Sequence, residues 1–497
     1  MLDAFAIPDV YAAEAVAMTG LADGELMARA VAGLVEIASA RLRAGGARRV
    51  VALVGPGNNG GDALYAAASL ARAGFDSAAV YLDGKVHRGA LAAAIAAGVV
   101  LKPVRPQSPA DAAGAVVERA DLILDGIVGI GGRPGLPDFA QPWVASIADT
   151  AHVLAVDLPS GQDPMGEKAD PAGVWADETL TFSLAKPVHL LPSTEAACGL
   201  LTIIDIGIAA PRGAVPWVRR LDRTDVPDLW PVPGPADDKY SRGVVGIIAG
   251  GENYTGAAVL ACTAAVNAGV GMVRYVGTPT PEALVRAAVP EAVHGVGQVQ
   301  AWVVGPGLDA AAPGEEAGIQ LRVVRDVLAS DARVVIDAGG LDLVTGPRPG
   351  ETVLTPHAGE AARLLTRLRA TGSTRSGPVS RHDVTSAPRA HARELAERLG
   401  AVVLLKGATT LVTAPGVDTA YAQSDAPSWL ATAGAGDVLA GLLGALAASR
   451  MPLADAAALA ALVHGVAADD ANPGGPVRAL AVANALPQTI ARLLRTA

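Results

Sequence analysis

The chain of 497 residues is long enough for two domains that each bury a sizeable core. Hydrophobic residues make up 51% of it and aromatic residues only 3%, with 57 glycines, so Ala, Val and Leu must build the core, which favours close-packed α/β layers. The formal net charge of −10 argues against a basic surface for nucleic acid or for an anionic membrane. We therefore expect neither partner, and we expect any phosphate group to be held by local structure.

Cysteine usage and the N-terminus indicate a reducing compartment. The two cysteines, Cys198 and Cys262, have the spacing of neither a disulfide framework nor a zinc site. The first residues lack the basic start of a secretory signal. The uncharged run 257–273 contains Asn267 and two glycines, so we interpret it as a buried helix followed by a strand. These features predict a cytoplasmic protein without a membrane span.

Short apolar runs recur along the chain, and alanine-rich helical patterns follow them. Nearly continuous Val, Ile and Leu runs that alternate with helices indicate parallel sheets covered on both faces. Both halves of the chain are therefore predicted to be α/β. The predicted strands are 49–54, 78–82, 121–124 and 153–156 in the first half, and 244–249, 272–276, 302–304, 334–336 and 402–405 in the second.

Two irregular stretches suggest how the chain is divided. Six prolines from Pro211 to Pro235 crowd a segment with little helical periodicity, which we interpret as the boundary between a domain at 1–222 and a domain at 223–497. A second stretch, from about Ala370 to Pro388, is rich in polar residues and predicts a surface loop within the second domain.

A glycine loop at 55–62 directly follows the first predicted strand. It has neither the spacing of a dinucleotide fingerprint nor the Lys and Ser/Thr of a Walker loop. Its central Asn58 and Asn59 offer both donors and acceptors, so the loop can hold a polar ligand together with a cation. A plain turn between strand and helix is the alternative interpretation.

Polar residues also follow two other predicted strands, in the segments 125–132 and 157–161, where α/β sheets bind ligands. Asn59, Asp125 and Ser160 together supply amide, carboxylate and hydroxyl oxygens, which suit a hard cation or an acid/base site. Asp157 is either part of this site or a cap at the end of a strand.

In the second half, residues 431–441 join a glycine turn, one carboxylate and an apolar helical pattern. Gly434 and Gly436 allow backbone N–H groups to approach an anion, and the start of the helix is positive. Asp437 is placed to take a proton from an attacking hydroxyl. This is the outline of a phosphate-transfer site, with a simple helix cap as the alternative.

These residues carry a resemblance to two known families. The first half resembles the NAD(P)H-hydrate epimerase family in its Asn-Asn-Gly-Gly-Asp loop (58–62), its Asp-x-x-x-Gly-x-Gly turn (125–131) and its Asp-Leu-Pro-Ser-Gly segment (157–161). The second half resembles the ADP-dependent NAD(P)H-hydrate dehydratase family. Its matching motifs are 238–243, 250–258, 305–308, 354–360, 405–410 and 434–437. The resemblance implies a Rossmann-like three-layer domain followed by a ribokinase-like α/β domain.

The resemblance also implies an activity, the repair of hydrated nicotinamide nucleotides. The first domain would interconvert the R and S forms of NADHX and NADPHX. The second would dehydrate the S form to NADH or NADPH, with ADP as phosphoryl donor and with AMP and phosphate as products. The implied ions are K⁺ in the first domain and Mg²⁺ in the second, and we also expect a homo-oligomer.

Site residues follow from the resemblance, position by position. Catalysis is assigned to Asp437 and Asp157. In the first domain the substrate would contact Asn58, Asn59, Gly60, Gly61, Asp62, Gly129, Ile130, Gly131, Gly132, Arg133, Pro134, Gly135 and Asp157, and K⁺ would contact Asn59, Asp125 and Ser160. In the second domain the substrate would contact Ala258, Gly307, His357 and Asp437, and the adenine nucleotide Lys406, Gly407, Ala408, Thr409, Thr410 and Gly436.

The sequence departs from the families at two places. Asp337 stands alone in the segment 335–341, where the commoner pattern has a second acidic residue, and Ile130 replaces the usual Thr. Two other functions are compatible with the residues alone. One is a small-molecule kinase of ribokinase type, which would accumulate a phosphorylated alcohol, and the other is a nucleotide-sensing protein, which would bind without turnover.

Overall fold

The computed structural model describes residues 1–105, 111–371 and 377–495. The chain divides into two compact units, one of residues 3–218 and one of residues 219–497 with residues 1–2. Each unit contains a largely parallel sheet with helices, so the predicted α/β class is confirmed. The division lies close to the proline-rich segment, and the functional boundary at 222/223 stays a prediction.

The sheet of the first unit is parallel throughout, in the order β4-β3-β2-β5-β6-β7-β8. Four of its strands match predicted ones, whereas β4, β7 and β8 were not predicted because polar or charged residues interrupt their apolar patterns. The strands are β2 (Arg49–Val54), β3 (Asp76–Leu82), β4 (Val100–Val104), β5 (Leu122–Gly126), β6 (His152–Val156), β7 (Glu178–Phe182) and β8 (Leu200–Ile204).

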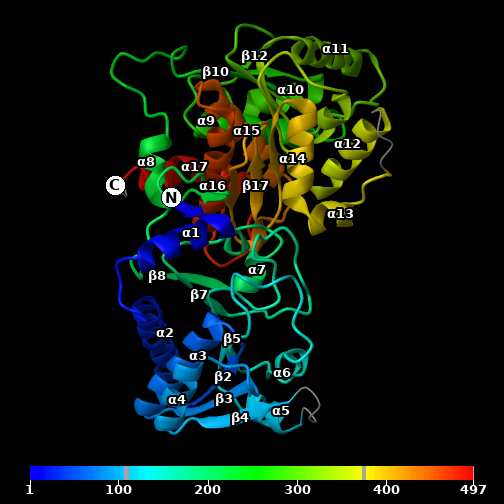
Figure 1. Ribbon diagram of the computed structural model, residues 1–497. Coiled ribbons are helices and arrows are strands. Elements are labelled where there is room, and N and C mark those ends of the chain that lie inside the picture. Colours follow the sequence, from blue (N-terminus) through cyan, green and yellow to red (C-terminus); the bar gives the residue numbers. More distant parts are fainter. Residues whose placement is uncertain (106–110, 372–376, 496–497) are drawn as a thin grey trace. The chain divides into compact units, whose positions relative to one another are not determined.

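Helices cover both faces of this sheet (Figure 1). Successive strand residues point to opposite faces, so Ala52 and Val54 pack with α2 (Glu25–Ala44), α3 (Asn58–Arg72) and α4 (Arg88–Ala96). Val51 and Leu53 pack on the other side. That side holds α5 (Asp111–Val117) and α6 (Gln141–Ala145), and the unit also contains α1 (Ile7–Met18) and α7 (Glu195–Cys198). The predicted three-layer arrangement is confirmed.

The larger sheet has the order β1-β9-β18-β17-β16-β15-β14-β13-β10-β11-β12. Strands β10 to β16 pair in parallel, whereas β17 and β18 add an antiparallel extension that was not predicted. The strands are β1 (Leu2–Ala4), β9 (Val218–Arg220), β10 (Val244–Ile248), β11 (Met272–Val276), β12 (Val293–His294), β13 (Ala301–Val304), β14 (Arg333–Ile336), β15 (Thr352–Leu354), β16 (Val402–Leu405), β17 (Thr410–Thr413) and β18 (Ala420–Gln423).

One face of this sheet carries α9 (Thr255–Asn267), α15 (Ala435–Ala448), α16 (Leu453–Ala471) and α17 (Ala479–Leu493). A Cβ at Gly441 would lie 2.2 Å from the Ala261 carbonyl oxygen, so a glycine is required where α15 crosses α9. The run 257–273 is a helix followed by β11, as predicted. The remaining helices are α8 (Val226–Leu229), α10 (Pro279–Ala288), α11 (Glu315–Ala329), α12 (Ala358–Thr371), α13 (Arg381–Ser386) and α14 (Pro388–Leu399).

The prediction of a surface loop at 370–388 is wrong in part. Residues 372–376 lie outside the described residues, but α13 occupies 381–386. Its start is fixed by a capping box between Ser380 and Asp383, and Val384 is fully buried. A helix this short has only one buried residue, which the polar composition concealed.

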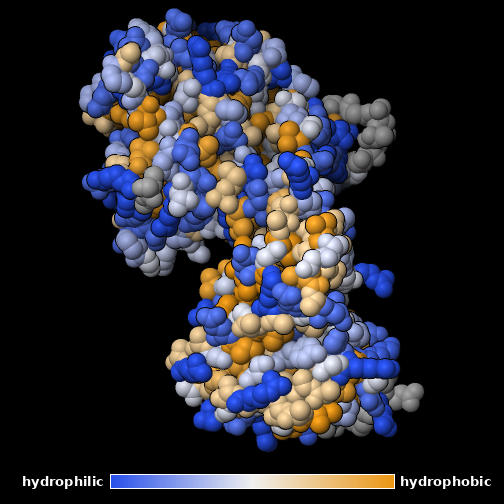
Figure 2. Space-filling view, turned by 60° about the vertical axis from the view of Figure 1, so that its left-hand side comes forward, coloured by the Kyte–Doolittle hydropathy of each residue, from blue (hydrophilic) through white to orange (hydrophobic). Residues whose placement is uncertain are grey.

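In the described part of the chain, no helix is long and apolar enough to cross a membrane. Hydrophobic residues are nevertheless exposed in places, among them Val16 and Met18 on α1, and Figure 2 shows hydrophobic patches between hydrophilic ones on the face in view. The predicted homo-oligomer stays a prediction.

Candidate functional sites

The first candidate site lies where the strand order of the first sheet reverses. The chain runs outward from β2 through β3 to β4, and then returns to β5 and β6 on the other side. The loops after β2, β5 and β6 therefore meet at the carboxyl edge of the sheet, where open α/β sheets bind ligands. The predicted residues lie at this edge: 58–62 form the start of α3 after the first of these loops, 125–135 begin at the end of β5, and 157–161 follow β6.

Close backbone packing explains the glycines of the first loop. A Cβ at Gly55 would lie 1.8 Å from the Ile127 carbonyl oxygen, and a Cβ at Gly60 would lie 2.1 Å from the Gly55 carbonyl oxygen. The loops after β2 and β5 therefore touch through their backbones. By contrast, a Cβ at Gly57 would meet no atom within 4 Å.

We expect Gly55→Ala to destabilise the first unit because the added methyl must displace the backbone at Ile127. Overpacking of this kind costs about 1–3 kcal/mol. Gly57→Ala is the matched control, since it adds the same atom in open space. Thermal unfolding of both variants measures the difference, and equal melting temperatures would contradict the close approach of the two loops.

Asn59, Asp125 and Ser160 come together behind these loops. Ser160 donates from its Oγ to Asp125 Oδ1 (2.7 Å) and from its N–H to Oδ2 (2.8 Å). The Asn59 amide donates to the carbonyl oxygens of Val156 (2.8 Å) and Val128 (3.3 Å). Asp125 is fully buried, and burial raises its pKa to about 6 despite these hydrogen bonds.

Asp157 is held by groups that sequence reasoning missed. Lys186, only 1% exposed, donates from Nζ to Asp157 Oδ1 (2.5 Å), and Thr181 Oγ1 donates to the same oxygen (3.0 Å). His189 Nδ1 accepts from the Lys186 N–H (3.0 Å), so its proton lies on Nε2, which donates to the Asp157 carbonyl oxygen (2.8 Å). Burial lowers the pKa of His189 to about 4, so the ring is neutral.

The backbone of Asp157 is also unusual. Its φ of 69° lies in the left-handed region that residues other than glycine rarely adopt. Such a conformation is stable only when neighbouring groups fix it, and Lys186, Thr181 and His189 supply that restraint. These contacts therefore fix the orientation of the Asp157 carboxylate at the end of β6.

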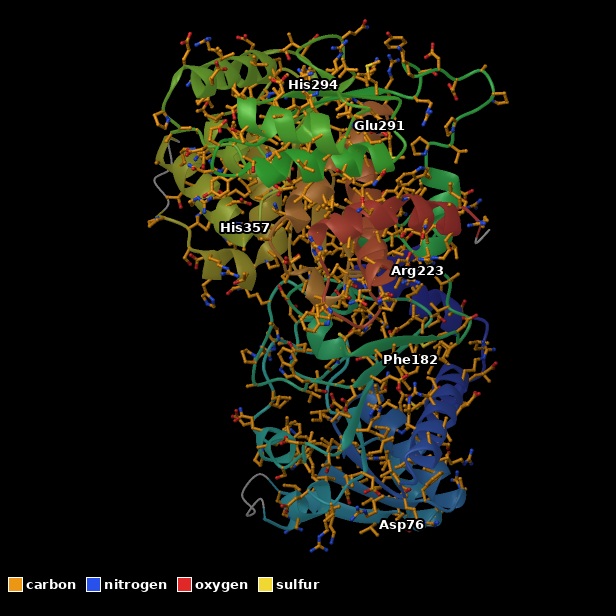
Figure 3. All side chains as sticks on the ribbon, turned by 180° about the vertical axis from the view of Figure 1, so that it is seen from behind. Asp76, Phe182, Arg223, Glu291, His294 and His357 are labelled. Atoms are coloured by element: carbon orange, nitrogen blue, oxygen red, sulfur yellow. The ribbon has the colours of Figure 1, made fainter. Side chains whose placement is uncertain are left out.

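A cavity of about 1550 Å³ opens beside these groups. Its wall includes Tyr11 and Glu14 from α1 and Phe182 from the end of β7. Phe182 is labelled in Figure 3. The predicted residues that line it are Asn58, Asn59, Asp62, Gly129, Ile130, Gly131, Gly132 and Asp157. Gly60, Gly61, Arg133, Pro134 and Gly135 do not line it, and their contact with a ligand stays a prediction.

Two acidic side chains of this cavity carry raised pKa values. Asp62 is 8% exposed, and its Oδ1 has no hydrogen-bond partner among the described residues. Burial together with the charges of Asp157 and Glu14 raises its pKa well above the ordinary value. Burial also raises the pKa of Glu14, an effect that Lys186 opposes. The cavity thus has an acidic wall in which burial favours the protonated form of Asp62.

The second candidate site lies at the carboxyl edge of the larger sheet. Lys406, at the end of β16, donates to Asp337 Oδ1 (2.7 Å), which also accepts from Thr355 Oγ1 (2.8 Å). The Lys406 ammonium lies 3.8 Å from Glu360 Oε2. Burial alone would lower the pKa of Lys406, but Asp337 and Glu360 outweigh it and raise the pKa. Lys406 is therefore a fixed positive charge within the site.

Asp437 stands in the first turn of α15, close to this ion pair. Gly434, with φ of 89°, caps the helix, and a Cβ at Gly436 would lie 3.5 Å from the Lys406 ammonium. Burial and the charge of Asp337 raise the pKa of Asp437 to about 7, against the influence of Lys406. A carboxyl group poised near neutrality beside a helix N-terminus suits proton transfer next to an anion.

The other predicted residues of this site occupy loops at the same edge. His357, labelled in Figure 3, follows β15, and its Nδ1 accepts from the Gly359 N–H (3.0 Å). Gly407, Ala408 and Thr409 lie between β16 and β17, and Thr410 begins β17. Gly307 follows β13, whereas Ala258 on α9 is 0% exposed, so no atom of it reaches the surface. Contact of Ala258 with a substrate stays a prediction.

Comparisons with known proteins agree with this two-site architecture. A family model described as YjeF-related protein N-terminus matches residues 23–188, and one described as NAD(P)H-hydrate dehydratase matches residues 245–487. The bifunctional NAD(P)H-hydrate repair enzyme Nnr of Mycobacterium tuberculosis is 43% identical over 91% of each chain. The predicted family is confirmed, as is the predicted order of the two domains.

Two solved structures resemble the second unit. An ADP/ATP-dependent NAD(P)H-hydrate dehydratase from Bacillus subtilis, co-crystallised with ATP and Mg²⁺, is 25% identical over 56% of this chain and 99% of that chain, with a TM-score of 0.48. A ribokinase-like superfamily protein from Enterococcus faecalis is 21% identical over 56% of this chain and 96% of that chain, with a TM-score of 0.47.

Proposed function

The chain belongs to the family of bifunctional NAD(P)H-hydrate repair enzymes, and we propose that its two sites divide the work as epimerase and ADP-dependent dehydratase. The observation that carries the proposal for the second site is Asp437, a carboxyl group with a pKa of about 7 in the first turn of α15. The first site is supported by Asp157, which lines the cavity and is paired with Lys186.

In the second site the hydroxyl on the carbon beside the ring nitrogen is the nucleophile. Asp437 accepts its proton while its oxygen attacks the terminal phosphoryl group of ADP, and AMP leaves. Backbone N–H groups near Gly434 and Gly436 stabilise the charge on the transferring group. Phosphate then departs with the electrons of the C–O bond, the ring nitrogen supplies its lone pair, and loss of a neighbouring proton restores the reduced ring.

Mg²⁺ is expected with the nucleotide, where it neutralises phosphate charge. Among the residues that the structure describes, no group of three or more His, Cys, Asp or Glu side chains is arranged to hold a metal ion. Apart from Asp437, the site contains the carboxylates of Asp337 and Glu360, and both interact with Lys406. We therefore propose that phosphate oxygens and water supply most of its ligands, as is usual for Mg²⁺.

The nucleotide preference tests the proposal for the second site. We expect ADP to support formation of reduced nicotinamide from the S epimer, with one phosphate and one AMP released for each molecule repaired. The measurement follows nicotinamide absorbance and free phosphate together, at saturating ADP and at saturating ATP. Accumulation of a phosphorylated alcohol without free phosphate would instead indicate an ordinary kinase.

We propose that the first domain holds K⁺ at Asn59, Asp125 and Ser160. The donors present are oxygens with one carboxylate, and the carbonyl oxygens of Val128 and Val156 lie beside them. This set suits a weakly hydrated monovalent cation better than Mg²⁺, which demands strict octahedral geometry. The ion would supply positive charge beside the ligand and would join the loops after β2, β5 and β6.

Asp125→Ala is expected to impair epimerisation and to leave ADP-dependent dehydration of the S epimer unchanged, because the second site lies in the other unit. The site itself is checked with crystals soaked in Rb⁺ or Tl⁺. An anomalous peak within coordination distance of the Asn59, Asp125 and Ser160 side chains is the expected result. Well-ordered crystals without such a peak would count decisively against the cation.

A further inference from the structure

We propose that Asp62 is the proton donor of the epimerase site, and that the substrate is epimerised by breaking and re-forming its C–O bond. This inference rests on the proposed epimerase function of the first unit. It concerns Asp62 and its neighbours in the cavity of about 1550 Å³ described above.

The first observation is the state of Asp62 itself. The side chain lines the cavity from the first turns of α3, yet the residue is only 8% exposed, and no residue within 1–105, 111–371 and 377–495 makes a hydrogen bond to its Oδ1. An unpaired buried carboxylate is unfavourable, so the group retains its proton, in keeping with its raised pKa. A protonated carboxyl facing a cavity can donate that proton to a ligand.

The second observation is the charge of the wall. Asp157 and Glu14 line the same cavity as Asp62 and come from different elements, the end of β6 and α1. The positive charge of Lys186 is paired with the Asp157 carboxylate at 2.5 Å. Once Asp62 has given up its proton, its carboxylate makes this part of the wall negative, which favours a positive charge beside it. Glu14 lies before residue 23, where the match to the family model begins.

The chemistry of the substrate connects these observations. The hydroxyl to be inverted sits on the carbon beside the ring nitrogen. If Asp62 gives its proton to this oxygen, the C–O bond breaks, water leaves, and the nitrogen lone pair forms a C=N bond. The product is an iminium cation, which an acidic wall stabilises.

Epimerisation is completed when a second water adds to the other face of the C=N bond. A new C–O bond forms, the C=N electrons return to nitrogen, and the proton lost by the water passes to the Asp157 carboxylate. Asp62 is left ionised and Asp157 protonated, and exchange with solvent restores both. The alternative, opening of the ring at its C–N bond and reclosure, needs no loss of the original oxygen.

The origin of the hydroxyl oxygen in the product therefore distinguishes cleavage of the C–O bond from opening of the ring. The full-length protein is supplied with the pure S epimer in H₂¹⁸O without ADP, so that the second domain cannot consume the substrate, and the R epimer is analysed by mass spectrometry after a single turnover. We expect each R molecule to carry one solvent oxygen, after correction for exchange without enzyme. An R epimer that retains its original oxygen would overturn the proposal.

Asp62→Asn tests the donor. This nearly isosteric change removes the transferable proton, so the epimerisation rate should fall by about 10²–10⁴ while ADP-dependent dehydration of the S epimer is unchanged. Asp76→Asn is the matched control, since Asp76 is exposed at the start of β3, on the amino edge of the sheet, and is labelled in Figure 3. A wild-type rate in the Asp62 variant would contradict the assignment.

The isotope result on the unchanged protein decides the route even if Asp62→Asn does not fold. A third outcome, no epimerisation by the unchanged protein at all, would reject the proposed function of the first unit and with it this inference.

Discussion

Replacing Asp437 by asparagine is expected to abolish dehydration and to leave epimerisation intact. The side chain keeps its shape but can no longer accept the hydroxyl proton, and loss of a general base lowers the rate by about 10²–10⁴. The effect is confined to one activity because Asp437 and the epimerase cavity lie in different units. Separate assays of the two activities measure it, and dehydratase turnover near that of the unchanged protein would refute the role of Asp437.

The pH profile and the stability of the same variant serve as controls. Because burial raises the pKa of Asp437 to about 7, kcat/KM of the unchanged dehydratase should fall as the pH drops below 7, where the base becomes protonated. The raised value also means that the folded state binds the proton more tightly than the unfolded state. The stability that this group contributes is lost as the pH rises towards 7. At pH 8 the Asp437→Asn variant should therefore melt at a higher temperature than the unchanged protein.

Replacing Lys186 by methionine should cause the largest loss of stability and of epimerase activity in the first unit. The change leaves the Asp157 carboxylate without its buried partner at 2.5 Å, and breaking such a pair costs about 3–5 kcal/mol. We expect a markedly lower melting temperature of this unit and loss of epimerisation, with dehydration of the S epimer retained. Lys85→Met is the matched control, because Lys85 is exposed.

The double variant Asp157→Asn with Lys186→Met separates stability from activity. Removing the charge of both partners should restore much of the melting temperature but not epimerisation, since the carboxylate is still missing. Restored epimerisation in the double variant would show that the pair has only a structural role.

Strands of both sheets were predicted where the sequence contains nearly continuous runs of apolar residues. Strands β2, β11 and β16 begin and end where they were expected, since most of their residues are apolar. Strand β7 was missed because it begins with Glu178, a residue that is only 1% exposed and pairs with Arg41 on α2. A local sequence pattern cannot predict a contact between residues so far apart in the chain.

The candidate sites show the same limit. Motifs placed Asn59, Asp125 and Ser160 at strand ends, and the fold brings them together. Lys186 was missed since it lies beyond the predicted motifs. A lysine within a stretch of otherwise mainly apolar residues, 184–191, was the available sign of a buried charge. Asp337 has no second acidic residue in its segment, as the sequence shows, and its basic partner Lys406 comes from a strand distant in the sequence.

Three predictions concern the whole protein, namely the boundary at 222/223, the homo-oligomer and the cytoplasmic location. The boundary is accessible through separate expression of residues 1–222 and 223–497, each assayed for one activity.

A single assay tests the central claim that the chain repairs both epimers. The purified protein is given an equal mixture of R and S hydrates with ADP, Mg²⁺ and K⁺, and reduced nicotinamide is followed by absorbance until the reaction stops. We predict complete conversion of the mixture, with one phosphate for each nicotinamide restored, faster than the hydrates interconvert without enzyme. Conversion that halts once the S epimer is consumed, or that proceeds without release of phosphate, would contradict the account.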